Sequence, residues 1–425
     1  MKLVSKDYLF SIILLGSVLL GGVIGVILGP KASVLKPFGD LFLNLLFMII
    51  VPMVFFSIAS AIASMGEMKR LGKIMGSIIL VFFITALIAA SLGLVVTLLM
   101  NPTEGINYAS LQSIVQADQS SPDKVKQAGI LEQLVKTFTV SDFPAVLSKT
   151  HILPLIVLAA LTGLSTALVG EDARPVASFL SAATQVMMKL VQIIMYYAPI
   201  GLGAYFANVV GELGTQILHG YLQTFITYIV LSVIYYFGFF TLYAYIAAGR
   251  KGIVAFWHNA VTPSVTALAT CSSAASIPIN LVATKAIGVP KDMVETIIPL
   301  GANIHKDGSV FGGVLKITFL FGLLGMDMSS LSTCAGIIGV SFLVGAVMGA
   351  IPGGGMIGEM LIISVYGFSP EVLPIIAVIS TIIDAPATLL NSTGNVVCSM
   401  LIARIVEGKD WLIKGYDKPE AQPLS

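Results

Sequence analysis

The chain has 425 residues, of which 56% are hydrophobic and only 11% are charged, with a formal net charge of +1. An ordinary soluble domain carries about 25% charged residues, so the composition excludes a soluble protein and predicts one embedded in a lipid bilayer. The net charge identifies no partner, and no nucleic-acid partner is expected. The three cysteines lie in apolar or small-residue surroundings without metal-ligand spacing, which predicts buried thiols.

Apolar runs of about 20 residues, long enough to cross a bilayer, recur along the chain. The clearest are 9–28, 41–63, 74–100, 152–169 and 224–248. The alternation typical of a membrane barrel is absent from the sequence, so we predict an all-α polytopic protein. We read the first run as a retained helix rather than a removed signal. Lysines and arginines cluster beside the spans on one side, which on balance predicts cytoplasmic N- and C-termini. Residues 101–150 are polar and predict an extracellular loop.

From residue 252 onward every apolar segment is interrupted by Gly, Pro, Ser or charge. We expect two re-entrant helical hairpins, at 253–283 and 332–365, because such segments are too broken to span but can turn round inside a protein-lined cavity. Each is followed by a long helix with a break, 293–324 at NIHKDG and 371–406 near NSTGN. The two units have inverted topology, a pattern typical of secondary transporters. The alternative explanation of these interrupted segments is that their glycines only allow close packing between membrane helices.

His305, Lys306 and Asp307 lie side by side at the first break, and Asp384 lies alone in the middle of the last helix. Charges at membrane depth are costly, so they face a cavity, pair with one another or carry function. We therefore expect a binding site where the two breaks meet. Lys316 is a further charge in the same helix; we expect it to extend to a membrane interface and assign it no function.

The motifs CSSAASIPIN, PLGANIHKDG, IPGGG and DAPATLLNSTGN, in this order and spacing, resemble those of the dicarboxylate/amino acid–cation symporter family, which includes glutamate and archaeal aspartate transporters. The serine/threonine and neutral amino-acid branch is the most similar. The resemblance implies eight transmembrane helices plus two re-entrant hairpins, and a homotrimer in a bacterial or archaeal inner membrane. It also implies an elevator mechanism, in which a transport domain (73–100 and 216–425) moves against a scaffold (1–72 and 151–215).

The resemblance also assigns the substrate site, including the two hairpin tips. The implied substrate-binding residues are Ser272, Ser273, Ser309, Gly354, Gly355, Asp384, Thr388 and Asn391. Asp384 would bind the substrate amine. Ala387 stands where acidic amino-acid transporters have an arginine, which favours a neutral substrate such as serine, threonine or alanine, because a second carboxylate would be buried unpaired. A C4-dicarboxylate or acidic amino acid, with Lys306 as the basic contact, is the alternative.

The coupling ion is where the chain departs from the family. Related proteins bind sodium through a motif Asn-Met-Asp-Gly-Thr and a later Asp, whereas this chain has His305, Lys306, Asp307 and then Asn395. Two like charges about 4 Å apart repel by roughly 4 kcal/mol at an effective dielectric of 20, so we expect Lys306 to replace a bound cation. A residual sodium site at Asp307 and Asn391 stays open. Coupling to sodium, to protons or to no ion all remain possible, and no cofactor is expected.

An enzyme is the main rival class. An intramembrane hydrolase needs a Ser or Asp nucleophile with a suitably placed His or second Asp, and His305 is the only histidine among the motifs. We therefore predict a transporter rather than an enzyme. A channel is the other alternative, and flux without saturation or exchange would favour it.

Overall fold

The computed structural model describes residues 4–63, 72–101, 139–148, 151–213, 216–348, 355–369 and 372–412. Within these ranges the regular structure is helical, without strands. Five of the described helices are long and apolar enough to cross a membrane. The predicted all-α class with several membrane-spanning helices is therefore confirmed. Most of the predicted extracellular loop, 102–138 and 149–150, lies outside the described residues.

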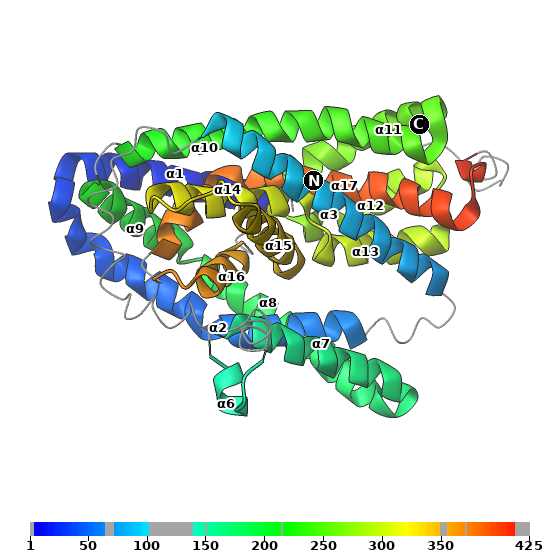
Figure 1. Ribbon diagram of the computed structural model, residues 1–425, viewed down its shortest axis with the longest axis horizontal. Coiled ribbons are helices and arrows are strands. Elements are labelled where there is room, and N and C mark those ends of the chain that lie inside the picture. Colours follow the sequence, from blue (N-terminus) through cyan, green and yellow to red (C-terminus); the bar gives the residue numbers. More distant parts are fainter. Residues whose placement is uncertain are drawn as a thin grey trace.

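One group of helices packs mainly on itself, with α2, α7 and α8 along one side of the molecule (Figure 1). Its members are α1 (Val4–Leu28), η1 (Gly29–Leu35), α2 (Lys36–Ala63), α7 (Ile152–Val169), α8 (Arg174–Met195) and α9 (Ala198–Leu213), with the short α6 (Phe143–Val146) beside α7. Glycines allow their backbones to approach closely: a Cβ at Gly21 would lie 2.2 Å from the carbonyl oxygen of Gly203, and one at Gly163 would lie 2.6 Å from that of Ala59. Small residues are typical of membrane helix contacts.

The second group starts with α3 (Gly72–Met100), which packs on helices from the second half of the chain. α10 (Gln216–Val233) continues through a π-helical turn, η6 (Ile234–Phe239), into α11 (Phe240–Thr270). α11 kinks at Ala248 and Gly249, and the φ of +62° at Gly249 is one that glycine adopts readily. The kink separates the predicted 224–248 span from the first arm of the first hairpin.

The first hairpin has the predicted helix–tip–helix form, and the two described arms of the second are both helical. The first joins the end of α11 to α12 (Ser273–Ile287). The second joins α15 (Leu331–Val347) to α16 (Met356–Tyr366). The tip of the second hairpin, which contains Gly354, lies outside the described residues. Between the hairpins the predicted broken helix is present as α13 (Lys291–Ile304) and α14 (Asp307–Leu323).

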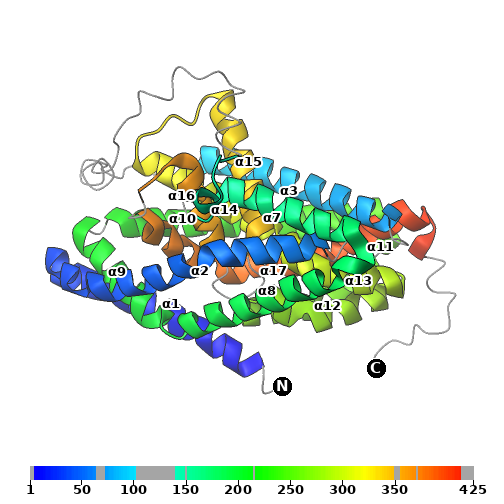
Figure 2. The same cartoon turned by 90° about the horizontal axis from the view of Figure 1, so that it is seen from below.

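The predicted break in the last helix is wrong, because α17 (Leu373–Glu407) is a continuous helix of 35 residues that also accommodates Pro386. It is the most buried of the candidate spans, with 61% of its apolar window inside the protein. α17 runs through the middle of the molecule (Figure 2). The side chains of its polar stretch bond to neighbouring helices, so the backbone keeps its own hydrogen bonds.

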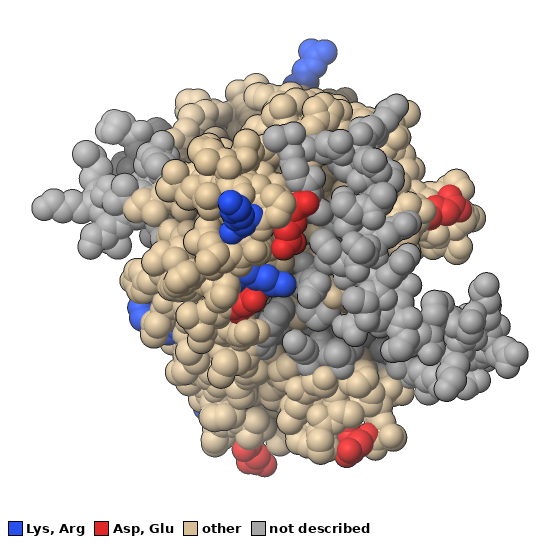
Figure 3. All heavy atoms as spheres, turned by 90° about the vertical axis from the view of Figure 1, so that its left-hand side faces the viewer, with Lys and Arg blue, Asp and Glu red and all other residues tan. Residues whose placement is uncertain are grey.

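The outer helices present apolar side chains to their surroundings. Examples are Leu168, Phe179 and Phe237, which are 78%, 60% and 60% exposed. Figure 3 shows one end of the molecule, where charged side chains are few and scattered among uncharged residues. Such surfaces suit contact with lipid or with another membrane subunit.

Candidate substrate site at the helix break

The break between α13 and α14 consists of two extended residues. His305 has φ −116° and ψ 109°, and Lys306 has φ −146° and ψ 71°. Extended backbone sends successive side chains to opposite sides, so His305 and Lys306 reach different parts of the protein although they are adjacent. With Asp307 they are 1–2% exposed, and each requires polar partners at this depth.

The imidazole of His305 lies in a cluster of oxygen atoms. Nδ1 is 2.9 Å from Asn395 Oδ1, and Nε2 is 2.7 Å from Thr85 Oγ1 and 3.2 Å from Asp307 Oδ1. The ring also stacks on Phe82 with centroids 4.2 Å apart. Because Asn395 Nδ2 donates to the Asn391 carbonyl (2.9 Å), its Oδ1 faces the ring, and Nδ1 must carry the proton that it donates.

Asp307 is bound from the other side by Tyr235, whose hydroxyl donates to Oδ2 over 2.7 Å. Tyr235 is fully buried and lies in the π-helical turn η6, a feature that often occurs at functional sites. The sequence analysis missed Tyr235 and Thr85. A threonine within the apolar 74–100 run was the available signal for Thr85, whereas Tyr235 lies in an aromatic run that gave none.

Lys306 forms no ion pair with Asp307 or Asp384 within 4 Å. Its Nζ donates to the backbone carbonyl of Met348 over 2.5 Å. Met348 directly follows α15, where the backbone leaves the helix. The side chain therefore links the helix break to the second hairpin.

Ser309 and Asn391, both predicted to bind substrate, lie together and bind each other. Asn391 Oδ1 accepts from the Ser309 amide (3.1 Å), and Asn391 Nδ2 donates to Ser309 Oγ (3.0 Å). The pair fixes the first turn of α14 to α17. The Ser309 hydroxyl keeps its own hydrogen for a further acceptor.

Asp384 lies on α17, is only partly buried, and interacts with the side chain of Thr388 one turn further on. It feels the charges of Lys316 and Lys306, but no lysine or arginine nitrogen of the described ranges lies within 4 Å of its carboxylate. Ala387 is buried beside the start of α14, where a Cβ on Gly308 would lie 2.4 Å from the Ala387 carbonyl oxygen.

The first hairpin tip places two predicted residues at the N-terminus of α12. The Ser272 hydroxyl caps this helix by accepting from the Ala275 amide over 3.2 Å, so it satisfies its own backbone, as serine often does at a helix start. Ser273 is the first residue of α12 and is buried. Gly355 begins the second arm of the other hairpin, where a Cβ would lie 3.1 Å from Ser380 Oγ.

Lys316 does not extend to an interface, so that prediction is wrong. Its Nζ lies 3.3 Å from Glu359 Oε1, and the two side chains are 1% and 0% exposed. Ser380, one turn before Asp384, donates to the same oxygen. Burying the Lys316 ammonium without an ion-pair partner would be very costly, and Glu359 on the second hairpin is that partner. The predicted hairpin already brought Glu359 toward the broken helix, which is the signal that we missed.

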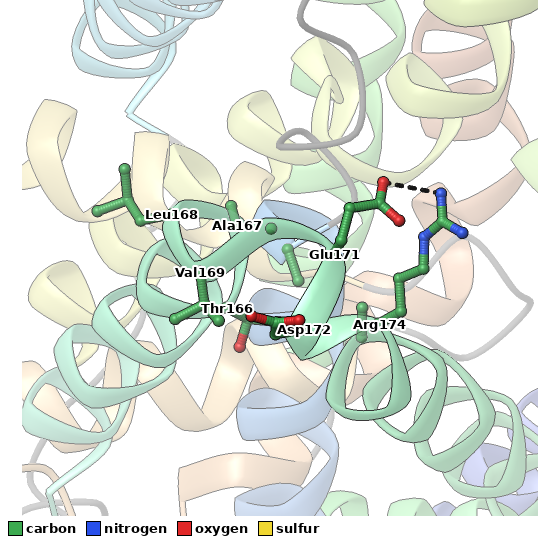
Figure 4. A pocket seen from close by; sticks show the side chains of 10 residues that line it. Thr166, Ala167, Leu168, Val169, Glu171, Asp172 and Arg174 are labelled. Atoms are coloured by element: carbon green, nitrogen blue, oxygen red, sulfur yellow. Dashed lines mark hydrogen bonds and ion pairs between the residues drawn. The ribbon is translucent and has the colours of Figure 1, made fainter.

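A pocket on the surface lies elsewhere, at the connection between α7 and α8 (Figure 4). Glu171 and Arg174 form an ion pair at its rim (2.9 Å) and are 77% and 63% exposed. None of the predicted site residues lines this pocket. The helix break and its surroundings are therefore the candidate site.

Two hairpins, a broken helix and charged residues buried between them define a membrane transporter of small molecules. The model of the sodium:dicarboxylate symporter family matches residues 9–405, and the chain belongs to this family. It is 28% identical to a proton/sodium-glutamate symport protein of Bacillus caldotenax, over 91% of this chain and 93% of the relative. It is equally similar to a C4-dicarboxylate transport protein of Acidovorax sp. (strain JS42), over 90% and 85%. The predicted family and the prediction of a transporter rather than an enzyme are confirmed.

Proposed function

We propose that the protein transports a small neutral amino acid, such as serine, threonine or alanine, across the plasma membrane by secondary transport. The observation that carries the proposal is Asp384, a partly exposed carboxylate that feels the charges of Lys306 and Lys316 but forms no ion pair among the described residues. A carboxylate at membrane depth requires a positive partner, and the ammonium group of an amino acid supplies one. Thr388 holds the carboxylate in place from the next turn of α17.

The surroundings of Asp384 argue against a second carboxylate on the substrate. The sequence contains no arginine between residues 251 and 403. The two lysines near Asp384 are already engaged, Lys306 by Met348 and Lys316 by Glu359. An acidic side chain would therefore be buried without a partner, at a cost of several kcal/mol.

The substrate α-carboxylate has donors on two helix starts. The first amides of α12 follow Ser272, and the hydroxyl of Ser309 stands in the first turn of α14. Helix N-termini attract anions through free amides and the helix dipole. Ser273, Ser309 and Asp384 together provide complementary contacts for a zwitterion, with Gly355 at the start of α16 as a further contact.

The proposal includes a homotrimer that works by an elevator movement. The division into helices that pack on one another (α1, α2, α7–α9) and helices that surround the site supports a fixed scaffold, 1–72 and 151–215, and a moving domain, 73–100 and 216–425. Glycine-lined contacts within the first group suit a rigid scaffold. Both termini are proposed to be cytoplasmic.

A C4-dicarboxylate is the second candidate, because relatives with that printed function share 28% identity over most of the chain. It requires Lys306 to exchange the Met348 carbonyl for a substrate carboxylate, and it leaves Asp384 facing an anion. An acidic amino acid, as in the glutamate symport relatives, would need the same exchange at Lys306.

Counterflow in proteoliposomes tests the proposal. Vesicles loaded with unlabelled serine should accumulate labelled serine, whereas succinate should neither enter nor compete. Asp384→Asn should reduce the rate by about 10- to 150-fold, the loss expected for a hydrogen bond to a charged group, whereas the exposed Asp292→Asn should transport normally. Succinate counterflow without serine counterflow would replace the first candidate with the second. Non-saturable flux would indicate a channel.

A further inference from the structure

We infer that Glu359 is a specificity-determining residue: its carboxylate neutralises Lys316 beside Asp384, and its removal enables the protein to bind an acidic amino acid. In this account Glu359 takes the place that the second carboxylate of an acidic substrate would have. The inference rests on the proposed binding of the substrate ammonium group by Asp384, and it adds the residue that decides which substrates are excluded.

The Lys316–Glu359 pair is enclosed within the protein. Lys316 Nζ lies 3.3 Å from Glu359 Oε1, and the two side chains are 1% and 0% exposed. The same Oε1 accepts from Ser380, whereas Oε2 has no hydrogen-bond partner among the residues that the structure describes. Only one oxygen of the carboxylate is therefore engaged in holding the helices together, although the whole charge is available to neutralise the lysine.

Glu359 approaches the candidate substrate site through Ser380. Ser380 lies one turn before Asp384 on α17, and Asp384 feels the charge of Glu359. Gly355, a predicted substrate contact, lies against the same serine, because a Cβ on this glycine would be 3.1 Å from Ser380 Oγ. The serine thus adjoins the glutamate and two residues that we propose to contact the substrate.

Lys316 approaches the same region from α14. A Cβ on Gly312, one turn earlier, would lie 3.8 Å from Lys316 Cε and 3.0 Å from Ile383 Cδ1. The lysine side chain therefore runs back toward the N-terminus of its helix, as long side chains on helices do, along the face that meets α17 next to Asp384. Asp384 feels this positive charge as well. An ammonium group bound at Asp384 would direct the remainder of an acidic substrate toward the lysine that Glu359 holds.

Stability alone does not explain why the protein buries these two charges. A buried ion pair is often no more stabilising than apolar side chains of similar volume, whereas removal of one member leaves the other buried without a partner. With Glu359 present, the charge of Lys316 is neutralised inside the protein. Without Glu359, the lysine requires a carboxylate from elsewhere, and an acidic amino acid bound at Asp384 supplies one.

A purely structural role for the pair is the competing explanation. It predicts that Glu359→Ala loses stability and gains no ligand. The proposed role predicts the same loss of stability, but it also predicts that aspartate restores part of that stability.

Thermal-shift titration of the full chain in micelles with aspartate separates the two explanations, because a ligand that binds the folded state raises its stability. The aspartate concentration that gives half of the maximal stabilisation should be about 10- to 150-fold lower for Glu359→Ala than for the wild type, as expected for a contact between charged groups. Equal concentrations for the two proteins would overturn the inference.

Two control variants show whether the gain depends on the buried ammonium group. Lys316→Met/Glu359→Ala offers the same space without the charge and should respond to aspartate as the wild type does. Glu295→Ala removes the partner of the exposed Lys285 and should also respond as the wild type does. A gain in the double variant equal to that in Glu359→Ala would overturn the inference.

Glu359→Gln provides a second test in case Glu359→Ala does not fold. Its amide oxygen can still accept from Lys316 and Ser380, so the contacts are retained while the negative charge is removed. This variant should also bind aspartate more tightly than the wild type does. Unchanged aspartate binding in each Glu359 variant that folds would overturn the inference.

Titration of the same proteins with alanine tests the proposed function separately. If alanine stabilises the wild type and no Glu359 variant gains aspartate binding, the inference is wrong and the proposed function stands. If alanine does not stabilise the wild type but Glu359→Ala gains aspartate binding, the proposed neutral substrate is wrong and the role of Glu359 is supported.

Discussion

Two polar stretches face each other within the protein, and only one of them interrupts its helix. Residues 305–306 separate α13 from α14, whereas residues 391–395 lie inside the continuous α17. Both stretches are buried; Gly308 lies two residues after the first, and Gly394 lies inside the second. The comparison shows that glycine and asparagine at membrane depth do not by themselves break a helix; what matters is where the side chains find partners.

Within residues 391–395 of α17, each polar side chain binds a different neighbouring segment. Asn391 binds Ser309 on α14, and Asn395 binds His305 at the break. The remaining two complete the set: Ser392 accepts from Asn280 on α12 (2.9 Å), and Thr393 pairs with Ser264 on α11 (3.1 Å). Four segments are thus bonded to one continuous helix.

The break between α13 and α14 directs its side chains to two different parts of the protein. Its extended residues send one side chain, His305, into the interior and the other, Lys306, to the second hairpin. We interpret α17 as the helix on which the other segments of the site are held, and the break as the segment that is bonded to the second hairpin through Lys306.

The largest effect is expected at the Lys316–Glu359 pair, which ties α14 to the second hairpin. Lys316→Met leaves a buried, unpaired Glu359 and should lower the free energy of unfolding by about 3–5 kcal/mol. The double variant Lys316→Met/Glu359→Met should recover most of this loss, since it removes both charges. Denaturation of the purified proteins in micelles measures these free energies of unfolding. If the loss in the double variant equals the sum of the losses in the two single variants, the pair is not coupled.

The contact between α17 and the break is tested by Asn395→Leu. It leaves Nδ1 of His305 without its partner, and a buried unsatisfied group costs about 1–3 kcal/mol. The exposed Asn303→Leu is the matched control, since its amide bonds only within α13. Equal melting temperatures for the two variants would contradict the role of Asn395.

The two glycines of the facing stretches should differ in their tolerance of alanine. A Cβ at Gly308 meets the Ala387 backbone at 2.4 Å, whereas one at Gly394 meets the Phe240 ring at 3.3 Å. Gly308→Ala should cost about 1–3 kcal/mol through overpacking, and Gly394→Ala should cost less. Thermal unfolding ranks them, and the reverse order would refute the assigned close approach of α14 to α17.

The sequence sufficed to predict the all-α class, the helical arms of both hairpins and the break at His305 and Lys306, because long apolar runs and their interruptions are local signals. It did not predict the continuity of α17. The partners that satisfy Ser392 and Thr393, namely Asn280 and Ser264, are more than 100 positions away, and only the packed structure brings them together. The Lys316–Glu359 pair was missed although Glu359 lies in the predicted second hairpin, because the sequence does not show which hairpin residue faces Lys316, 43 positions away.

The central claim is that Asp384 receives the ammonium group of the substrate. A thermal-shift titration of the wild type and Asp384→Asn with alanine and with lactate tests it most directly, because lactate carries a hydroxyl in place of the amine and a ligand that binds only the folded state raises its stability. Alanine should stabilise the wild type alone, and lactate should stabilise neither protein. Equal stabilisation of the wild type by alanine and lactate, or undiminished stabilisation of Asp384→Asn by alanine, would contradict the claim.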